Sequence, residues 1–217
     1  MGESGGVTLT FKRWLFLFFT TLLLGGVTAL VASFLVNREG IEAITASLSE
    51  FVAGSVFLFA VGMTFSAVSQ MSFFAYLLIN RLALGLFRSK KLWQYAQVLL
   101  IAFTFFDLVY FRYTAFGQEG ESWIPYLLFP TLFLTITLVL AWLKAKQTNQ
   151  QAFVPALFLL FVVTTIAAVP ALVINDPVWV QLMLITILVC HTWQLFLLPY
   201  LNAGEKKEKS LLKKKSA

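Results

Sequence analysis

The sequence contains few of the groups from which soluble enzymes build active sites. Charged residues make up 12% of its 217 residues, and it has one cysteine and one histidine. A single cysteine excludes an intramolecular disulfide and any site built from several thiolates. The zinc, nucleophile-elbow, phosphate-loop and dinucleotide-binding motifs are also missing. These absences predict that the protein is not an enzyme and carries no cofactor.

Acidic residues are scarce in the apolar part of the chain. Asp107 is the only acid clearly inside an apolar run, and His191 is the only histidine. Because a metal ion needs several converging ligands, the sequence predicts no metal site. The net charge of +6 does not indicate nucleic acid, because the cations lie between apolar runs or near the C-terminus and form no aromatic-interleaved patch.

Apolar residues dominate instead. They make up 59% of the chain, with 23 phenylalanines and a mean hydropathy of +0.85. A bilayer core needs about 20 apolar residues as a helix, and backbone polar groups in hydrocarbon must bond within the protein. Six runs of sufficient length occur, at 14–36, 51–79, 92–111, 123–143, 152–174 and 178–200. The sequence therefore predicts an all-α polytopic transmembrane bundle of six spans over residues 1–203, followed by a lysine-rich tail at 204–217.

The basic residues predict how this bundle is oriented. Lys and Arg collect on the cytoplasmic side of membrane proteins. With six alternating spans, all of the 16 basic residues except Arg38 and Arg112 fall on the side of the two chain ends. Both termini are therefore predicted to be cytoplasmic. The tail lysines are suited to anionic lipid headgroups; they are Lys206, Lys207, Lys209, Lys213, Lys214 and Lys215.

The second run is longer than a bilayer core requires. It either tilts steeply or bends near Ser69 and Gln70 and then follows the membrane interface. The first run carries Gly25, Ala29 and Ser33 at four-residue spacing, which favours close contact with another helix of the bundle or of a partner.

Polar side chains within the runs are the candidates for contacts between helices. Ser69, Gln70 and Gln97 fall at a similar depth, and amides at such depth form hydrogen bonds between helices. Asp107 lies near the outer end of the third run, close to Tyr110 and Arg112, where an ionised carboxylate must be paired, protonated or hydrated. Packing within the chain and contact with another membrane protein both remain open. His191, near mid-depth, is more typical of a neutral hydrogen-bonded side chain than of a base.

The second and third runs contain the most distinctive pattern. It comprises Ser69-Gln70-Met71-Ser72-Phe73-Phe74-Ala75-Tyr76, Arg81, Gly85-Leu86-Phe87, Leu92-Trp93, Gln97, Leu100-Ile101 and Phe106-Asp107-Leu108-Val109-Tyr110-Phe111-Arg112-Tyr113. This pattern resembles the KinB-signalling pathway activation protein family of spore-forming bacilli. The resemblance is strongest over residues 60–117, while length and six-span character agree over nearly the whole chain.

The resemblance implies a non-enzymatic accessory protein of the bacterial cytoplasmic membrane. Such a protein promotes activation of a membrane sensor histidine kinase that feeds the sporulation phosphorelay, and its partners are this kinase and membrane lipid. The hypothesised contacts with the kinase or between helices are Ser69, Gln70, Arg81, Gln97, Asp107, Tyr110 and Arg112. Two alternatives remain, a small proton-coupled transporter that uses Asp107 and a membrane enzyme, which would need two ionisable groups at one depth.

Overall fold

The described part of the chain is helical throughout. The computed structural model describes residues 4–36, 47–87, 89–116, 122–174 and 176–215, and these ranges contain no strand. The long helices are α1 (Ser4–Val36), α3 (Leu48–Leu86), α4 (Lys90–Phe116), α5 (Leu128–Gln147) and α9 (Pro177–Lys215). Six helical segments are long and apolar enough to cross a membrane, which confirms the all-α prediction and the number of candidate spans.

The fifth of these segments departs from the prediction of one regular helix over 152–174. It starts with a 3-10 turn at Gln150–Ala152, continues as α6 (Phe153–Leu157), widens into a π-helix at Phe158–Val163, and returns to α geometry in α7 (Thr164–Ala167). The chain then breaks at Ala168, where φ is −90° and ψ is 0°, before the short α8 (Val169–Ile174). Pro170 contributes to this break because it lacks a backbone N–H for a continuing helix.

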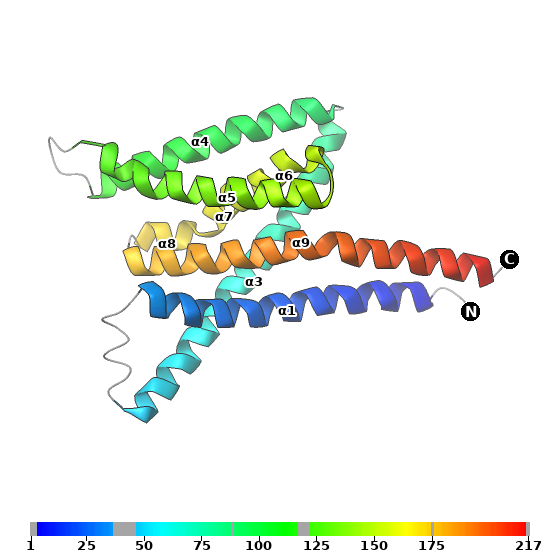
Figure 1. Cartoon of the computed structure of the whole chain (residues 1–217), viewed down its shortest axis with the longest axis horizontal. Coiled ribbons are helices and arrows are strands. Elements are labelled where there is room, and N and C mark those ends of the chain that lie inside the picture. The colour runs from blue at the N-terminus through cyan, green and yellow to red at the C-terminus, as the bar shows by residue number, and fades with distance from the viewer. Residues whose placement is uncertain (1–3, 37–46, 88, 117–121, 175, 216–217) are drawn as a thin grey trace.

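The long helices form two groups around α9. Helices α1 and α9 lie side by side and antiparallel, and α3 crosses them obliquely, while α4, α5 and the α6–α8 segment lie on the other side of α9 (Figure 1). Helix α3 continues without a break past Ser69 and Gln70 and crosses the bundle obliquely (Figure 1), which favours tilt over a bend, the two alternatives that the sequence left open. The start of α1 and the end of α9 lie at the same end of the bundle (Figure 1).

Helix α9 runs on beyond the predicted sixth span. It continues as helix to Lys215, through most of the segment that the sequence predicts as a tail, although the side chains of residues 202–217 lie outside the described part. A second 3-10 turn, Ile124–Leu127, precedes α5 within the fourth predicted run. The fourth long helix therefore starts at Leu128, five residues after the predicted start at Trp123.

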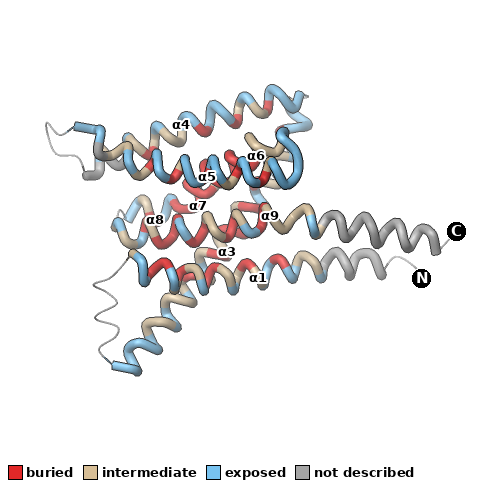
Figure 2. Tube along the Cα trace, in the orientation of Figure 1, coloured by how far each residue is buried: buried red, intermediate tan, exposed pale blue. Residues whose placement is uncertain are grey.

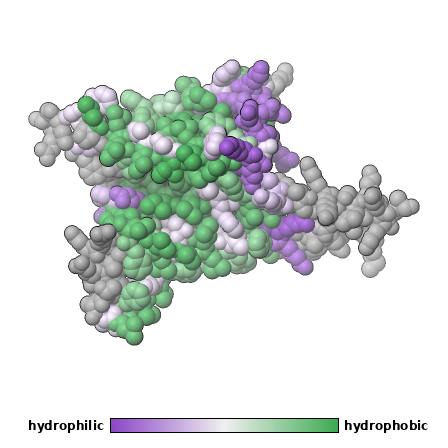
Figure 3. Space-filling view, in the orientation of Figure 1, coloured by the Kyte–Doolittle hydropathy of each residue, from purple (hydrophilic) through white to green (hydrophobic). Residues whose placement is uncertain are grey.

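The core lies where the two groups of helices meet. Buried residues follow the inward faces of α5, the π-helix and α9 (Figure 2), with Phe73, Phe161 and Ile187 completely buried. The visible described surface is largely apolar, and hydrophilic side chains gather toward the end of the bundle where α1 starts and α9 ends (Figure 3). Exposed apolar side chains such as Leu99, at 71%, are compatible with a bundle that contacts lipid tails.

Helices α1 and α3 approach most closely where glycines face each other. A Cβ on Gly62 would lie 2.5 Å from the Cβ of Ala29 and 2.5 Å from the carbonyl oxygen of Gly25. Ala29 and Ser33, on the same face of α1, are buried at 0% and 4% exposure. The small-residue pattern of the first run therefore serves packing within the chain, where absent side chains let two backbones approach.

Replacing Gly62 with alanine should destabilise the bundle, because neither Ala29 nor the backbone of Gly25 can move aside without separating the helices. We expect a loss of about 1–3 kcal/mol in the free energy of unfolding in detergent. Gly85→Ala is the matched control, since nothing lies within 4 Å of a Cβ there and alanine is the better helix former. Equal stability of the two variants would contradict the close crossing.

Candidate helix-contact site

His191 is the centre of the buried polar site. Its ring is 0% exposed on α9 and bonds to two other helical segments. Nε2 lies 2.9 Å from Oγ of Ser72 and 3.1 Å from the carbonyl oxygen of Ser69, both on α3. Nδ1 lies 2.8 Å from Oγ1 of Thr164, the first residue after the π-helix. One side chain therefore joins α3, α7 and α9.

These partners determine the tautomer of His191. The Ser69 carbonyl can only accept, so Nε2 must carry the ring proton. Ser72 donates its own hydroxyl proton to the same carbonyl at 2.9 Å, which leaves its oxygen free to accept from Nε2. Thr164 then donates to Nδ1. A protonated Nε2 cannot take the proton of Ser72, so this Ser–His contact is not an activated nucleophile.

A second set of hydrogen bonds joins α1 to the same region of the bundle. Oγ of Ser66 donates to the carbonyl oxygen of Thr21 at 2.8 Å, and Nε2 of Gln70 reaches the carbonyl oxygen of Phe18 at 3.4 Å. From α9, Nε1 of Trp193 donates to Oγ1 of Thr20 at 3.3 Å. Helices α1, α3 and α9 are thus tied together by side chains from all three.

The predicted amide residues lie inside the bundle. Ser69, Gln70 and Gln97 are exposed by 0%, 3% and 0%. Gln70 bonds to α1, whereas both polar side-chain atoms of Gln97, Oγ of Ser69 and Oε1 of Gln194 have no partner among the described groups. Buried amides without partners destabilise a fold, so these positions are candidates for functional selection.

The other predicted contact residues are more accessible. Asp107 is half-buried on α4, Tyr110 is 52% exposed one turn later, and Arg81 is exposed on α3. The rings of Phe106 and Tyr110 stack with centroids 6.1 Å apart. The side chains of Arg112 and of the lysines from Lys206 to Lys215 lie outside the described part. The structure therefore separates the predicted set into an interior group and a group along α4 and the end of α3.

Lys144 is a buried residue whose structural role the sequence analysis missed. The residue is 5% exposed. Its Nζ donates to the carbonyl oxygen of Leu195 at 2.7 Å and to Oε1 of Gln147 at 3.0 Å. Pro199, four residues after Leu195, has no N–H and leaves that carbonyl without its helical donor. Lys144 supplies the missing hydrogen bond from α5.

Two further residues lacked a usable sequence signal. Thr164 is fully buried beside His191, but threonines in apolar helices usually bond to their own backbone, so its type predicts nothing. Ser72 was noted only within the family pattern.

A signal for Lys144 was present, since a proline near the end of the sixth run is matched by a lysine directly after the fourth.

The fold and site together define a class of protein. It is a six-helix bundle with an apolar surface, a buried polar interior and, among the described residues, no group of three or more His, Cys, Asp or Glu side chains that could hold a metal ion. Several of its buried polar side chains, His191 among them, form hydrogen bonds between helices.

Comparison with known proteins gives the family. Residues 25–201 match the family described as KinB-signalling pathway activation in sporulation. A KinB-signaling pathway activation protein of Bacillus subtilis (strain 168) is 41% identical over 154 residues, which cover 69% of this chain and 78% of that protein. No solved structure matches. The chain belongs to the KinB-signalling pathway activation family, which confirms the resemblance seen in its sequence.

Lys144→Met should lower the free energy of unfolding by about 1–2 kcal/mol, because the Leu195 carbonyl loses its donor. In a Pro199→Ala background the same change should cost less, since the alanine would supply a backbone N–H to that carbonyl. Lys146→Met is the control, because Lys146 is exposed and lies over the ring of Trp142. Unfolding in detergent gives the free energy of unfolding of Lys144→Met, Pro199→Ala, the double variant and Lys146→Met. If the losses caused by Lys144→Met and Pro199→Ala simply added in the double variant, this role of Lys144 would be contradicted.

Proposed function

We propose that this chain is a non-enzymatic integral membrane protein that promotes activation of the membrane sensor kinase of the KinB pathway. The family match over residues 25–201 carries this proposal, and the relative's name assigns that protein to the activation of KinB signalling. Six apolar helices and a polar interior engaged in helix contacts support it. The kinase in turn feeds the sporulation phosphorelay.

The proposed orientation places both termini in the cytoplasm. Hydrophilic side chains gather at the end of the bundle where α1 starts and α9 ends (Figure 3). The end of α3, the start of α4 and the end of α5 lie at this end (Figure 1), and they carry Arg81, Lys90, Lys91 and Lys146. Two acidic residues lie at helix starts at the opposite end, Glu50 in the first turn of α3 and Asp176 directly before α9. This distribution follows the retention of basic residues on the cytoplasmic side.

The outer face of α4 is the surface that we propose for contact with the kinase. Its inner stripe, Trp93, Gln97, Ile101 and Leu108, is buried against the bundle. Its outer face carries Tyr95, Leu99, Phe103, Phe106 and Tyr110, all at least half exposed. Asp107 lies at the edge of this face and supplies a polar group for a neighbouring helix.

The interior residues act on this surface indirectly. Ser69, Gln70 and Gln97 can reach a partner only if the bundle opens. In the closed structure the carbonyl of Ser69 and the side chain of Gln70 join α3 to α9 and α1, whereas the amide of Gln97 is buried without a described hydrogen-bond partner. A partner that binds one of two kinase signalling states more tightly shifts the kinase toward that state. Activation therefore needs no chemistry in this chain.

The transporter alternative gains no support from the described hydrogen bonds. His191 bonds to Ser69, Ser72 and Thr164, and none of its bonds reaches Asp107. A relay between these two groups is therefore not formed in this structure.

Replacing Asp107 or Tyr110 with alanine should reduce kinase-dependent reporter output while the protein remains at its normal level in the membrane. The expected loss follows from removal of the polar and aromatic contacts on the outer face of α4. Leu23→Ala is the control, since Leu23 is 57% exposed on α1, away from this face. Unchanged output for both α4 variants would count against this contact surface.

A photo-crosslinking amino acid at Phe103 should capture the kinase in native membranes, whereas the same group at Leu23 should not. Mass spectrometry of the crosslinked product identifies the captured protein. Capture from Leu23 alone would move the contact surface to α1, and capture of the kinase from neither position would argue against direct contact.

Limited proteolysis tests the orientation. We expect the lysine-rich C-terminal segment to resist trypsin added to intact cells and to be cut in inverted membrane vesicles. Cleavage from outside intact cells would reverse the proposed topology and separate the tail from any cytoplasmic partner.

A further inference from the structure

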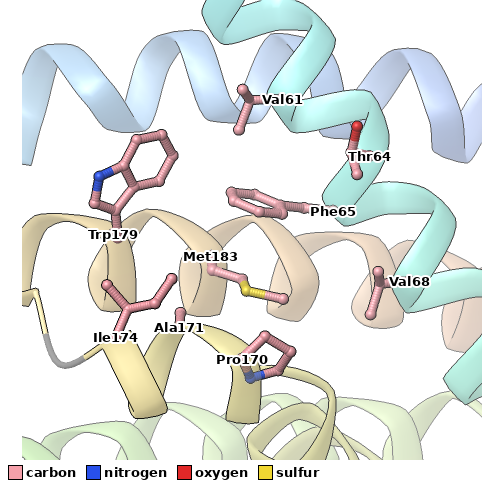
Figure 4. Close-up of a pocket in the computed structure, with 9 residues that line it drawn as sticks. All are labelled: Val61, Thr64, Phe65, Val68, Pro170, Ala171, Ile174, Trp179 and Met183. Carbon is pink, nitrogen blue, oxygen red and sulfur yellow. The ribbon is translucent and has the colours of Figure 1, made fainter.

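An apolar pocket lies between α3, α8 and α9, apart from the polar site. Its volume is about 470 Å³, within the range of roughly 300–1,000 Å³ typical of small-molecule sites. From α3 it is lined by Val61, Thr64, Phe65 and Val68, which recur at the spacing of one helix face. These side chains face residues of α8 and α9 across the pocket (Figure 4).

The break in the fifth segment shapes the opposite wall. Pro170 and Ile174 of α8 line the pocket, directly after the interruption at Ala168. From α9 the lining residues are Trp179 and Met183, one turn apart. The pocket therefore lies where α8 and the start of α9 face the middle of α3.

The lining excludes a polar ligand. No charged side chain lines the pocket, and its one hydroxyl, that of Thr64, already donates to the carbonyl oxygen of Ala60 at 3.1 Å. A site for a polar molecule needs a few polar groups placed to fix its orientation. Apart from the Thr64 hydroxyl, the indole N–H of Trp179 is the only polar side-chain group in the lining.

The position of Trp179 gives the direction of entry. The carboxylate of Asp176 accepts hydrogen bonds from the backbone N–H groups of Val178 and Trp179 at 2.8 and 3.1 Å, so Asp176 caps α9 and Trp179 lies in the first turn of this helix. Tryptophan at the start of a spanning helix is typical of the headgroup level of a bilayer. Met183 and Val68 then lie deeper, so the pocket extends from the interface toward the membrane interior.

We propose that this pocket is a binding site for the acyl chain of a membrane phospholipid. This inference rests on the membrane location in the proposed function and goes beyond it. In a bilayer there is no water to fill an open apolar pocket, and the surrounding lipid supplies flexible apolar chains at very high concentration. A chain that enters beside Trp179 fills the space between α3 and α8 while its headgroup stays at the interface.

A partner helix fits this site less well than a lipid chain. Close helix contact in membranes uses small residues on both sides, as at the crossing of Gly25 and Gly62. The pocket wall consists mainly of bulky Val, Phe, Ile, Trp and Met side chains, with Ala171 the one alanine. A flexible chain adapts to such an uneven wall, whereas a helix backbone cannot approach it closely.

The bound chain has a structural consequence. Helix α8 has only six residues and follows a break, so it has few contacts of its own to hold it. An acyl chain between α8 and α3 supports both. Because these helices also bear Ser69, Ser72 and, through α7, Thr164, the length and branching of membrane acyl chains become able to influence the polar site.

The test uses the full chain reconstituted in phospholipid vesicles that contain a phosphatidylglycerol with a diazirine on one acyl chain. After irradiation, mass spectrometry should find more label on peptides of residues 61–68 and 179–183 than on the outer face of α4 around Leu99, which contacts bulk lipid. Val61→Phe and Thr64→Phe each place a ring in the pocket and should abolish this excess label. Val56→Phe makes the matched change on the same helix at a position outside the pocket lining and should leave it intact.

Each outcome bears on the proposal. Pocket label no higher than the label around Leu99, or excess label that survives both pocket variants, would overturn it. A photo-crosslinking amino acid at Thr64 in native membranes should yield a phospholipid adduct, and a protein adduct in its place would assign the pocket to a partner helix. Absence of label around Leu99 as well would refute the membrane location itself, whereas loss of pocket label alone leaves the kinase proposal untouched.

Discussion

Helices in a bilayer, the location that we propose for this chain, gain nothing from hiding apolar side chains from one another, because lipid tails are equally apolar. The bundle therefore depends on close packing and on hydrogen bonds between helices. The hydrogen bonds of His191, which connect α9 to both α3 and α7, lie at the centre of these contacts. The glycine crossing of α1 and α3 provides the packing that lets Ser66 and Gln70 reach the backbone of α1.

Pro199 follows the same rule. It removes one helical N–H, and a side chain from a neighbouring helix reaches the carbonyl that has lost its donor. Lys144 of α5 bonds to the carbonyl oxygen of Leu195, four residues before Pro199. In hydrocarbon an unsatisfied carbonyl is costly, so a proline becomes a point of contact between helices.

The number and placement of the long helices could be predicted because span length follows from bilayer thickness. The contact face of α1 could be predicted too, since Gly25, Ala29 and Ser33 align at helical spacing. The π-helix and the break at Ala168 could not, because the apolar run 152–174 satisfies a hydropathy pattern in either geometry. The tilt of α3 depends on its crossing with α1, a tertiary contact that periodicity within one run does not contain.

The candidate site was predicted only in part, for a related reason. Sequence identified Ser69, Gln70 and Gln97 as polar groups at one depth but could not decide whether they face inward or toward a partner. Their burial follows from how α3 and α4 are rotated about their axes, which packing decides. Thr164 carries no distinguishing pattern at all, and Lys144 was counted only for its charge.

The interior thus forms a fixed frame, and the exposed face of α4 is the surface that we propose for contact with the kinase. The frame depends on one neutral imidazole whose Nε2 carries the proton. Because His191 is the only histidine, nitrogen-15 NMR of the protein in membranes reports on it without ambiguity. We expect a single neutral tautomer with the proton on Nε2 and a hydrogen-bonded, unprotonated Nδ1. A proton on Nδ1, or a mixture of tautomers, would contradict the arrangement of helices described above.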